Sequence, residues 1–181
     1  MIGMGSVLVG RLRGVEGRDG TRWLSAEEND AWVSLSWLMI RLPTAIDAQL
    51  QRDSGIQFFE YLVLAALSMM PERRMQMSDL AQYVNGSPSR LSNVVKRLEQ
   101  RGWVVRRPSA ENGRVVEATL TDAGMVVVEQ AAPGHVEAVR RLVFDVLSAE
   151  QVTGLRDIGR QVARQVDPQR AWPLYAGEDQ E

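Results

Sequence analysis

Apolar residues in this chain recur mostly at helical spacing. Ser25-Ala-Glu-Glu28 is a capping box, because Ser25 can accept a hydrogen bond from the third helical N–H and Glu28 can reach back to it. The pattern predicts a long helix over residues 25–52, with a kink or a lost hydrogen bond at Pro43. A second, mostly buried helix is predicted over 57–70. The apolar stripe of the first helix is Trp32, Leu35, Leu38, Leu42, Ile46 and Leu50.

A short helix, a tight turn and a longer helix are predicted next. Ser78 is expected to cap the short helix, and Asn85-Gly86 is a turn dipeptide. Ser87 is expected to cap the longer helix, whose first position is Pro88, the favoured place for proline, and Gly102 is a natural stop. This unit is expected to bury Leu80, Ala81, Val84, Leu91, Val94, Val95, Leu98, Trp103 and Val105.

The pattern then changes to the alternation of β-strands. Residues 103–107 and 114–120 are prone to form strands, and the turn-like stretch 108–113 separates them, so a β-hairpin is predicted. A short helix, a turn, a longer helix and a hairpin in this order make a winged helix-turn-helix. The alternating apolar side chains of the hairpin are Trp103, Val105, Val116, Ala118 and Leu120.

Two more helices are predicted after the hairpin. Thr121 is expected to cap the first, which should bend at residues 131–134 and continue to about Leu147. Ser148-Ala-Glu-Gln151 is a second capping box, and the helix that it starts should end at Asp167-Pro168. The predicted fold class is therefore mainly α with a small β-hairpin wing (α+β), built on a winged helix-turn-helix core.

Composition removes several classes of function. The 181 residues are 45% hydrophobic and 24% charged, which is typical of a globular protein, and they include no cysteine and one histidine. Without cysteine the chain has no disulfide, thiolate nucleophile, Cys-based zinc site or thiol redox sensor. His135 alone cannot build a His-rich metal site, and we expect an ordinary surface or helix-end histidine.

Motifs of enzymes and of membrane proteins are missing from the sequence. It has no glycine-rich phosphate loop, nucleophile elbow or metal cluster, so we predict no enzymatic activity, no metal and no cofactor. The longest apolar-rich run, Tyr61–Met70, is shorter than the roughly 20 residues of a membrane helix. In residues 1–22 the apolar residues precede the arginines, the reverse of a signal peptide, so we expect a flexible tail and a cytoplasmic protein.

Charge is distributed unevenly along the chain. The net charge is −2, yet Ser87–Arg114 contains seven basic and two acidic residues, while the remainder contains 14 basic and 21 acidic ones. A basic patch on an acidic body is typical of a surface that binds phosphates. In the longer helix the basic and small polar residues lie on the arc opposite the apolar ones, so this helix can dock in the major groove of DNA.

The first two turns of this recognition helix carry the candidate base readers. N-terminal turns of recognition helices are the ones that reach base edges. Arg90 can bind guanine through two hydrogen bonds, and Asn93 can bind adenine. The small polar residues Ser87, Ser89 and Ser92 complete the set, although Ser87 is equally well explained as a helix cap.

Further basic residues are candidates for the DNA backbone and the minor groove. Arg114 near the hairpin tip can enter a minor groove, and Asn112 lies beside it. Arg106 and Arg107 face opposite sides of their strand, so at most one of them faces DNA, and Arg107 is our candidate. The residues placed for phosphate contacts are Lys96, Arg97 and Arg101.

Four motifs follow one another along the chain with a characteristic spacing. They are Met77-Ser-Asp-Leu-Ala81, Ser89-Arg-Leu-Ser-Asn-Val-Val-Lys-Arg-Leu-Glu99, Arg101-Gly-Trp-Val-Val-Arg106, and Asn112-Gly-Arg114 followed by Leu120-Thr-Asp-Ala-Gly124. Together they resemble the MarR/SlyA (multiple-antibiotic-resistance) family of bacterial repressors, over roughly Trp23 to Val166. One position departs from the family: Asn112 stands where the wing usually carries an acidic residue, so the usual ion pair with the wing arginine cannot form.

The resemblance implies a homodimer that binds a pseudo-palindromic operator in double-stranded DNA and represses transcription. It also implies N- and C-terminal dimerisation helices around the DNA-binding domain. The expected division is a flexible tail (1–24), an N-terminal dimerisation helix (25–56), the winged helix-turn-helix domain (57–121), C-terminal dimerisation helices (122–167) and a second tail (168–181).

Members of this family often release DNA when a small aromatic or anionic compound binds between the dimerisation helices and the DNA-binding lobe. The candidates for lining such a cleft are Trp32, Trp37, Phe58, Phe59 and Tyr61, which can equally be core aromatics. Two other functions stay open: a winged helix used only for protein association, and a DNA binder without sequence preference. Salt dependence tests the first, and comparison of operator with random DNA tests the second.

Overall fold

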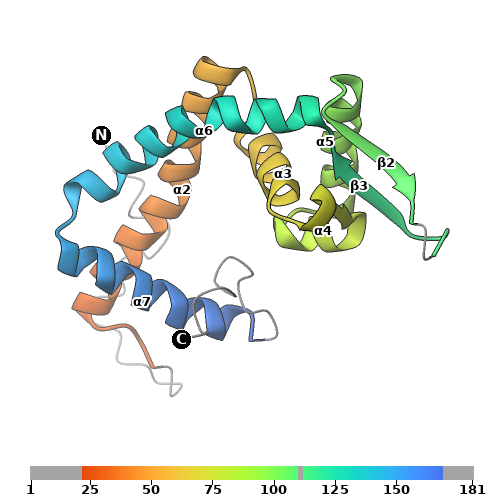
Figure 1. The fold of residues 1–181 in the computed structure, drawn as a ribbon. Coiled ribbons are helices and arrows are strands. Elements are labelled where there is room, and N and C mark those ends of the chain that lie inside the picture. Colours follow the sequence, from red (N-terminus) through yellow and green to blue (C-terminus); the bar gives the residue numbers. More distant parts are fainter. Residues whose placement is uncertain (1–21, 110–111, 169–181) are drawn as a thin grey trace, which may run out of the picture. The chain divides into compact units, whose positions relative to one another are not determined.

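The structure, a computed structural model, describes residues 22–109 and 112–168. The chain divides into two compact units, one up to His135 and one from Val136 onward; Figure 1 gives the order of the elements along the chain. The two predicted tails lie almost entirely outside the described residues. No helix in the two described ranges has the length and apolar character needed to span a membrane.

The first described helix, α2, covers Ala26–Ser54. It begins at the predicted capping box, in which the Glu28 N–H donates to Ser25 Oγ (3.1 Å) and the Ser25 N–H donates to Glu28 Oε2 (2.7 Å). The helix continues through Pro43 and ends at Gly55, whose φ of 64° is the left-handed conformation that glycine adopts without strain. Only its C-terminal half is buried, through Ile46, Gln49 and Leu50.

Helix α3 (Phe58–Ser68) is the mostly buried helix that the sequence predicts. A short 3-10 helix, η1 (Pro71–Arg73), and a three-residue strand, β1 (Arg74–Gln76), follow it. The strand was not predicted, because three residues are too few to show alternation. It exists because it pairs with a strand far along the chain, with Arg74 opposite Thr119 and Gln76 opposite Glu117.

This pairing also corrects the predicted cap of the next helix. Helix α4 (Met77–Tyr83) starts before Ser78, and its N-cap is Gln76, whose side chain makes no capping hydrogen bond. Strand β1 extends to Gln76, so the helix begins in the very next residue. The Ser78 hydroxyl donates instead to the carboxylate of Asp79 (3.2 Å), and the prediction that Ser78 caps α4 was wrong.

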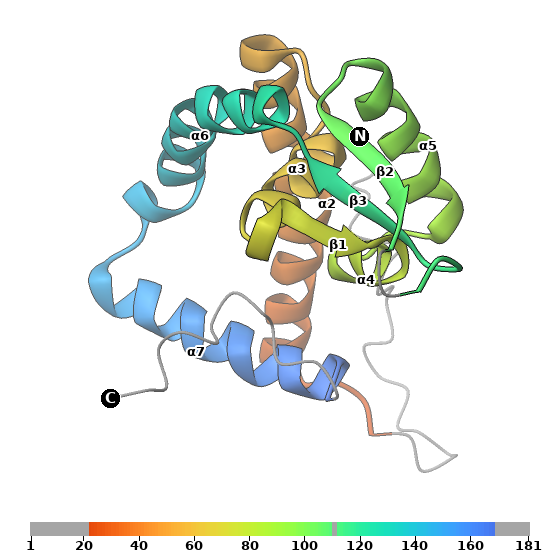
Figure 2. The same ribbon diagram turned by 45° about the vertical axis from the view of Figure 1, so that its right-hand side comes forward.

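Helix α5 (Pro88–Gln100) and the hairpin of β2 (Val104–Pro108) and β3 (Val116–Leu120) complete the winged helix-turn-helix. Strand β3 lies between β1 and β2 in a three-stranded antiparallel sheet (Figure 2). In the hairpin Val104 is opposite Leu120, and Arg107 is opposite Glu117. The predicted elements are therefore present, with one additional strand.

The inward-facing side of β2 differs from the prediction by one residue. Val104 is buried, whereas Trp103 and Val105 are only half-buried. The cause lies in the helix end: Gly102 has a φ of 73°, and the Trp103 N–H still donates to the Leu98 carbonyl (3.0 Å). The Trp103 N–H thus caps the C-terminal end of α5, and the strand alternation starts after this residue. In β3, Val116 is also exposed rather than inward-facing.

One hydrophobic core joins these elements. It contains buried residues of α3, α4, α5 and the sheet, so the recognition helix is fixed along its apolar face. Its fully buried members include Val63, Leu64, Leu67, Leu80, Leu91, Val95, Leu98 and Ala118. A second cluster packs α2 against α3 through Ile46, Leu50, Ile56, Tyr61 and Ala131.

Helix α6 (Asp122–Leu142) starts where predicted, and the Gly124 N–H donates to Thr121 Oγ1 (3.0 Å). It is continuous through Pro133 and ends at Leu142, earlier than predicted, where a 3-10 helix η2 (Phe144–Val146) follows. Helix α7 (Ala149–Val166) begins at the predicted second capping box. None of the α7 side chains is buried.

Candidate nucleic-acid interface

Helix α5 has the cap that its sequence predicts. Ser87 Oγ accepts the Arg90 N–H (3.2 Å), and Pro88 occupies the first helical position. Ser87 Oγ also lies 3.2 Å from Ser89 Oγ. Both hydroxyls are exposed, so the cap does not remove Ser87 from the surface that a ligand can reach.

The two faces of α5 have different chemistry. Leu91, Val94, Val95 and Leu98 are buried in the core. Ser89, Asn93 and Lys96 lie on the opposite arc, three and four positions apart, and are exposed. An exposed row of a hydroxyl, an amide and an ammonium group on a rigidly packed helix can form hydrogen bonds with base edges and phosphate oxygens.

Arg90 is exposed but is not free in space. Its guanidinium lies over the ring of Phe59 on α3, 3.9 Å from the ring centroid. The ring is itself packed beneath Gly86, where an added Cβ would be 2.6 Å from Phe59 Cζ. Phe59 therefore serves as a platform for the Arg90 guanidinium.

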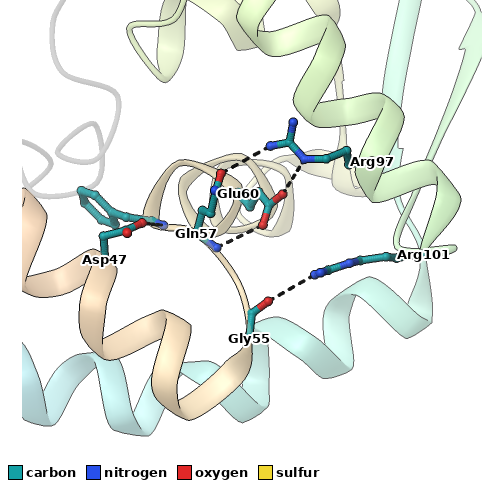
Figure 3. Close-up of polar contacts among 7 residues, drawn as sticks. Asp47, Gly55, Gln57, Glu60, Arg97 and Arg101 are labelled. Atoms are coloured by element: carbon teal, nitrogen blue, oxygen red, sulfur yellow. Dashed lines mark hydrogen bonds and ion pairs between the residues drawn. The ribbon is translucent and has the colours of Figure 1, made fainter.

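Arg97 also contacts α3, which the sequence did not indicate. Its Nε donates to Glu60 Oε1 (3.0 Å), and its Nη2 donates to the side-chain oxygen of Gln57 (3.4 Å), as Figure 3 shows. One turn later, Arg101 Nη1 donates to the Gly55 carbonyl (3.5 Å). Arg97, which the sequence predicts to contact a phosphate, thus already has a carboxylate partner within the protein.

Arg106 and Arg107 diverge as predicted. Arg106 forms an ion pair with Glu99, with Nε and Nη2 both donating to Oε2 at 2.9 and 2.6 Å, and its Nη1 donates to Ser92 Oγ (3.4 Å). Hydrogen bonds from Arg106 hold the pKa of Glu99 below its ordinary value. Arg107 remains exposed. Ser92 is half-buried beside this pair, so the candidate base contact of Ser92 competes with an internal hydrogen bond.

The wing tip has a turn built on Asn112. Its side-chain oxygen accepts the Arg114 N–H (3.2 Å), and its carbonyl accepts the Val115 N–H (2.8 Å). Asn112 therefore organises this turn through hydrogen bonds with backbone N–H groups. The Arg114 side chain is exposed on this turn.

The aromatic cleft candidates fall into two groups. Phe58 and Tyr61 lie in or against the second core cluster. Trp32 and Trp37 are exposed on the N-terminal half of α2, and at 1.5 Å per residue Trp32 is about 20 Å along the helix from Ile46. A cavity of about 330 Å³ is lined by other residues: Asp53, Ser54, Trp103, Val127 and Gln130.

His135 corrects another prediction, because it lies inside α6 rather than at a helix end or on the open surface. Its ring is half-buried, 4.7 Å from the Tyr61 ring and 6.5 Å from the Phe58 ring, centroid to centroid. Among the described residues its Nδ1 is buried without a hydrogen-bond partner. Burial lowers the pKa of His135 below its ordinary value of 6.5.

This burial predicts a pH-dependent stability. The unfolded chain takes up a proton on His135 at higher pH than the folded protein does, so the free energy of unfolding should fall as the pH drops below about 6.5 and should be unaffected by this group above it. Denaturant unfolding on both sides of that pH measures the effect. His135→Phe should lose this part of the dependence, and an equal slope in both proteins would contradict the assignment.

The partners of α5 at the start of α3 were not predicted from the sequence: Gln57, Phe59 as a platform, and Glu60. One signal was present, since Glu60 is the single charged residue of Phe58–Ser68 and stands three positions after Gln57, as in a capping box. A carboxylate in an otherwise apolar, buried helix requires a partner. Within the described ranges, no group of three or more His, Asp and Glu side chains could hold a metal ion.

The comparisons with known proteins agree with this architecture. The model of the MarR family matches residues 54–115. Sco3205, a MarR family transcriptional regulator from Streptomyces coelicolor solved in complex with DNA, is 44% identical, with a TM-score of 0.78 over 84% of this chain and 96% of that chain. AbsC, another MarR family regulator from the same organism, is 34% identical, with a TM-score of 0.76 over 82% of this chain and 100% of that chain.

Among curated proteins, the transcriptional repressor MprA of Escherichia coli K12 is 24% identical over 116 residues. The match covers 64% of this chain and 65% of the length of MprA. Element order, sheet topology and the exposed polar row of α5 define a winged helix-turn-helix protein. The chain belongs to the MarR family.

Proposed function

We propose that this protein is a sequence-specific transcriptional regulator that binds double-stranded DNA through α5 and the wing. The observation that carries the proposal is the exposed row of Ser89, Asn93 and Lys96 on a helix whose other face is locked in the core. Membership of a family that includes a regulator solved in complex with DNA supports it. A regulator of this kind acts on chromosomal DNA in the cytoplasm and needs no catalytic group or cofactor.

Each candidate contact has a role in this proposal. Arg90 and Asn93 read base edges, supported at the helix start by Ser87, Ser89 and Ser92. Lys96 and Arg107 bind phosphates, and Arg114, presented by the Asn112 turn, enters the minor groove. Arg97 belongs to the same basic surface. Its positive charge is already balanced by the Glu60 carboxylate, so we do not expect it to neutralise a phosphate.

We further propose that the protein acts as a homodimer on a pseudo-palindromic operator. Helix α7 supports this, because its apolar stripe is exposed from Leu155 onward and such stripes are normally covered. The first half of α2 carries a second set of exposed apolar residues. The stripe on α7 is Leu155, Ile158, Val162 and Val166, and the α2 set includes Trp32, Leu35, Trp37 and Leu38.

We also propose that a small aromatic or anionic effector binds the protein. Its candidate site includes fewer of the aromatic residues than the sequence suggested. Phe58 and Tyr61 lie beside His135, whose Nδ1 is buried without a partner among the described residues. The side-chain oxygen of Gln49, on the adjacent stretch of α2, is likewise buried without a hydrogen-bond partner among the described residues. Polar atoms of this kind beside aromatic rings favour a ligand that has both a ring and a hydrogen-bonding group.

The test of the function compares two duplexes, one from upstream of the gene and one random, by fluorescence anisotropy at several salt concentrations. Preference for the upstream duplex with a steep salt slope supports a specific regulator. Equal binding to both would favour a DNA binder without sequence preference. No binding by a folded dimer would favour a winged helix used for protein association.

Two substitutions test the separate roles of the exposed row. Asn93→Ala should weaken binding to the preferred duplex by roughly 5- to 150-fold, equivalent to about 1–3 kcal/mol, and should change binding to random DNA little. Lys96→Ala should weaken binding to both duplexes and lower the salt slope by about 1.8, because each subunit of the dimer loses one phosphate contact. Equal losses on both duplexes for Asn93→Ala would contradict its role as a base reader.

A further inference from the structure

Helix α5 carries two polar rows that have different surroundings. Ser89, Asn93 and Lys96 form the outer row described above. The other row consists of Arg90, Arg97 and the C-cap residue Arg101, which are seven and four positions apart. All three contact residues 55–60, which comprise the link between α2 and α3 and the first turn of α3. Lys96 and Arg97, neighbours in sequence, are therefore not equivalent, because Lys96 is exposed on the outer row whereas Arg97 is bound to the rest of the unit.

Glu60 is the centre of this attachment, and both of its carboxylate oxygens are used. Oε2 accepts the Gln57 N–H (3.0 Å), which caps the start of α3, and Oε1 accepts from Arg97 Nε (3.0 Å). The Gln57 side chain then binds the far nitrogen of the same guanidinium (3.4 Å). Figure 3 shows the two residues on one side of the Arg97 fork. A single carboxylate thus links the first turn of α3 to the third turn of α5.

The same segment is also fixed to α2. Asp47 Oδ1 accepts the Phe58 N–H at 2.7 Å, so the N–H groups of the N-cap residue and of the first residue of α3 both have carboxylate acceptors. The Gly55 carbonyl, just after α2, accepts from Arg101 (3.5 Å). Hydrogen bonds therefore connect α2 to the start of α3, and the start of α3 to the recognition helix (Figure 3).

We propose that Glu60 and Arg97 are a positioning pair that sets the orientation of the recognition helix, and that Arg97 does not neutralise a DNA phosphate. The inference rests on the proposed DNA-binding function. Its physical basis is burial: the Glu60 side chain is 6% exposed, so its charge requires a partner inside the protein, whereas the Arg97 side chain is 47% exposed and reaches inward to supply it. The pair is electrically neutral and so displaces no counterion when DNA binds.

The salt slope separates positioning from phosphate contact. Arg97→Gln and Glu60→Gln should each weaken binding of a duplex that spans two half-sites by roughly 3- to 30-fold. The double variant Glu60→Gln/Arg97→Gln, in which the site stays neutral, should bind more weakly than wild type at every salt concentration with the wild-type slope. The matched control is the neighbouring Lys96→Ala, whose slope should fall by about 1.8, one phosphate contact for each subunit. The probe is a labelled duplex selected by the wild-type protein from a random pool, so the operator need not be known.

Arg97→Gln leaves the buried Glu60 carboxylate without its cation and can therefore misfold. The double variant Glu60→Gln/Arg97→Gln avoids this problem. It removes both charges, so it should fold, and it should bind no more weakly than the weaker single variant because both substitutions break the same link. Melting curves of all variants, taken at one protein concentration, establish the folded fraction.

Two results would overturn the inference. One is a slope lowered by about 1.8 in the double variant, where the site stays neutral, since that change marks the loss of one phosphate contact in each subunit. The other is wild-type affinity in both single variants, which would mean that the link does not position the helix. Failure of the proposed function looks different, because wild-type protein would then bind DNA without a steep salt dependence.

Discussion

Replacing Gly124 with alanine is expected to destabilise the protein by about 3 kcal/mol. An added Cβ would lie 2.2 Å from the Trp103 carbonyl oxygen and 2.6 Å from Leu120 Cδ1. The first of these atoms belongs to the backbone and also accepts the Thr121 N–H (3.0 Å), so it cannot rotate away as a flexible side chain can. The start of α6 would have to move away from the wing, and the melting temperature should fall by roughly 10 °C.

A second glycine provides the matched control for this measurement. Gly154 lies within α7, where an added Cβ meets nothing within 4 Å. Alanine there should stabilise the helix by about 0.5–1 kcal/mol, because glycine loses more conformational entropy on folding. Thermal unfolding of both variants at one protein concentration tests the pair. Comparable melting temperatures for Gly124→Ala and wild type would show that α6 and the wing are not packed as described.

The elements that the sequence predicted correctly carried their own local signals. The capping boxes at Ser25 and Ser148 and the Ser87-Pro88 start all lie where helices begin. Such signals act over three or four residues and do not depend on the rest of the fold. The winged helix-turn-helix could be predicted for the same reason, since its order of elements follows from the boundaries.

The errors occurred where a distant contact or a long-range pairing decides the structure. Strand β1 and the start of α4 are set by β3, more than 40 residues away, so Ser78 looked like a cap without being one. The inward-facing residues of β2 differ from the predicted ones by one position because the capping hydrogen bonds of α5 extend to Trp103. A pattern within one segment contains no information about either effect.

The site was predicted by residue type but not by partner. The exposed row on α5 follows from helical periodicity, and the structure places Asn93 and Lys96 there. The ion pair between Glu60 and Arg97 joins residues 37 positions apart. Glu60 stands out in the sequence as the one charge of an apolar helix, but nothing in the sequence identifies Arg97 as its partner. Arg97 therefore appeared equivalent to its neighbour Lys96.

Replacing Ile158 with glutamate is expected to convert the proposed dimer into monomers. Ile158 is 63% exposed in the single chain and lies at the middle of the apolar stripe on α7. If a second copy covers this stripe, the substitution places a charge in an apolar interface, and symmetry introduces it twice. Sedimentation analysis should give the mass of one chain at concentrations where the wild type gives the mass of two.

Loss of the dimer should also remove most of the DNA affinity. One winged domain can bind only one half-site, and linking two modules commonly raises the apparent affinity by about 10²–10⁴. Thr153→Glu is the control, because Thr153 is exposed on the arc of α7 opposite the stripe and gives the same charge on the same helix. It should remain dimeric and bind DNA normally. A dimeric Ile158→Glu would place the interface elsewhere, whereas a monomer that keeps full affinity would show that one α5 and one wing suffice.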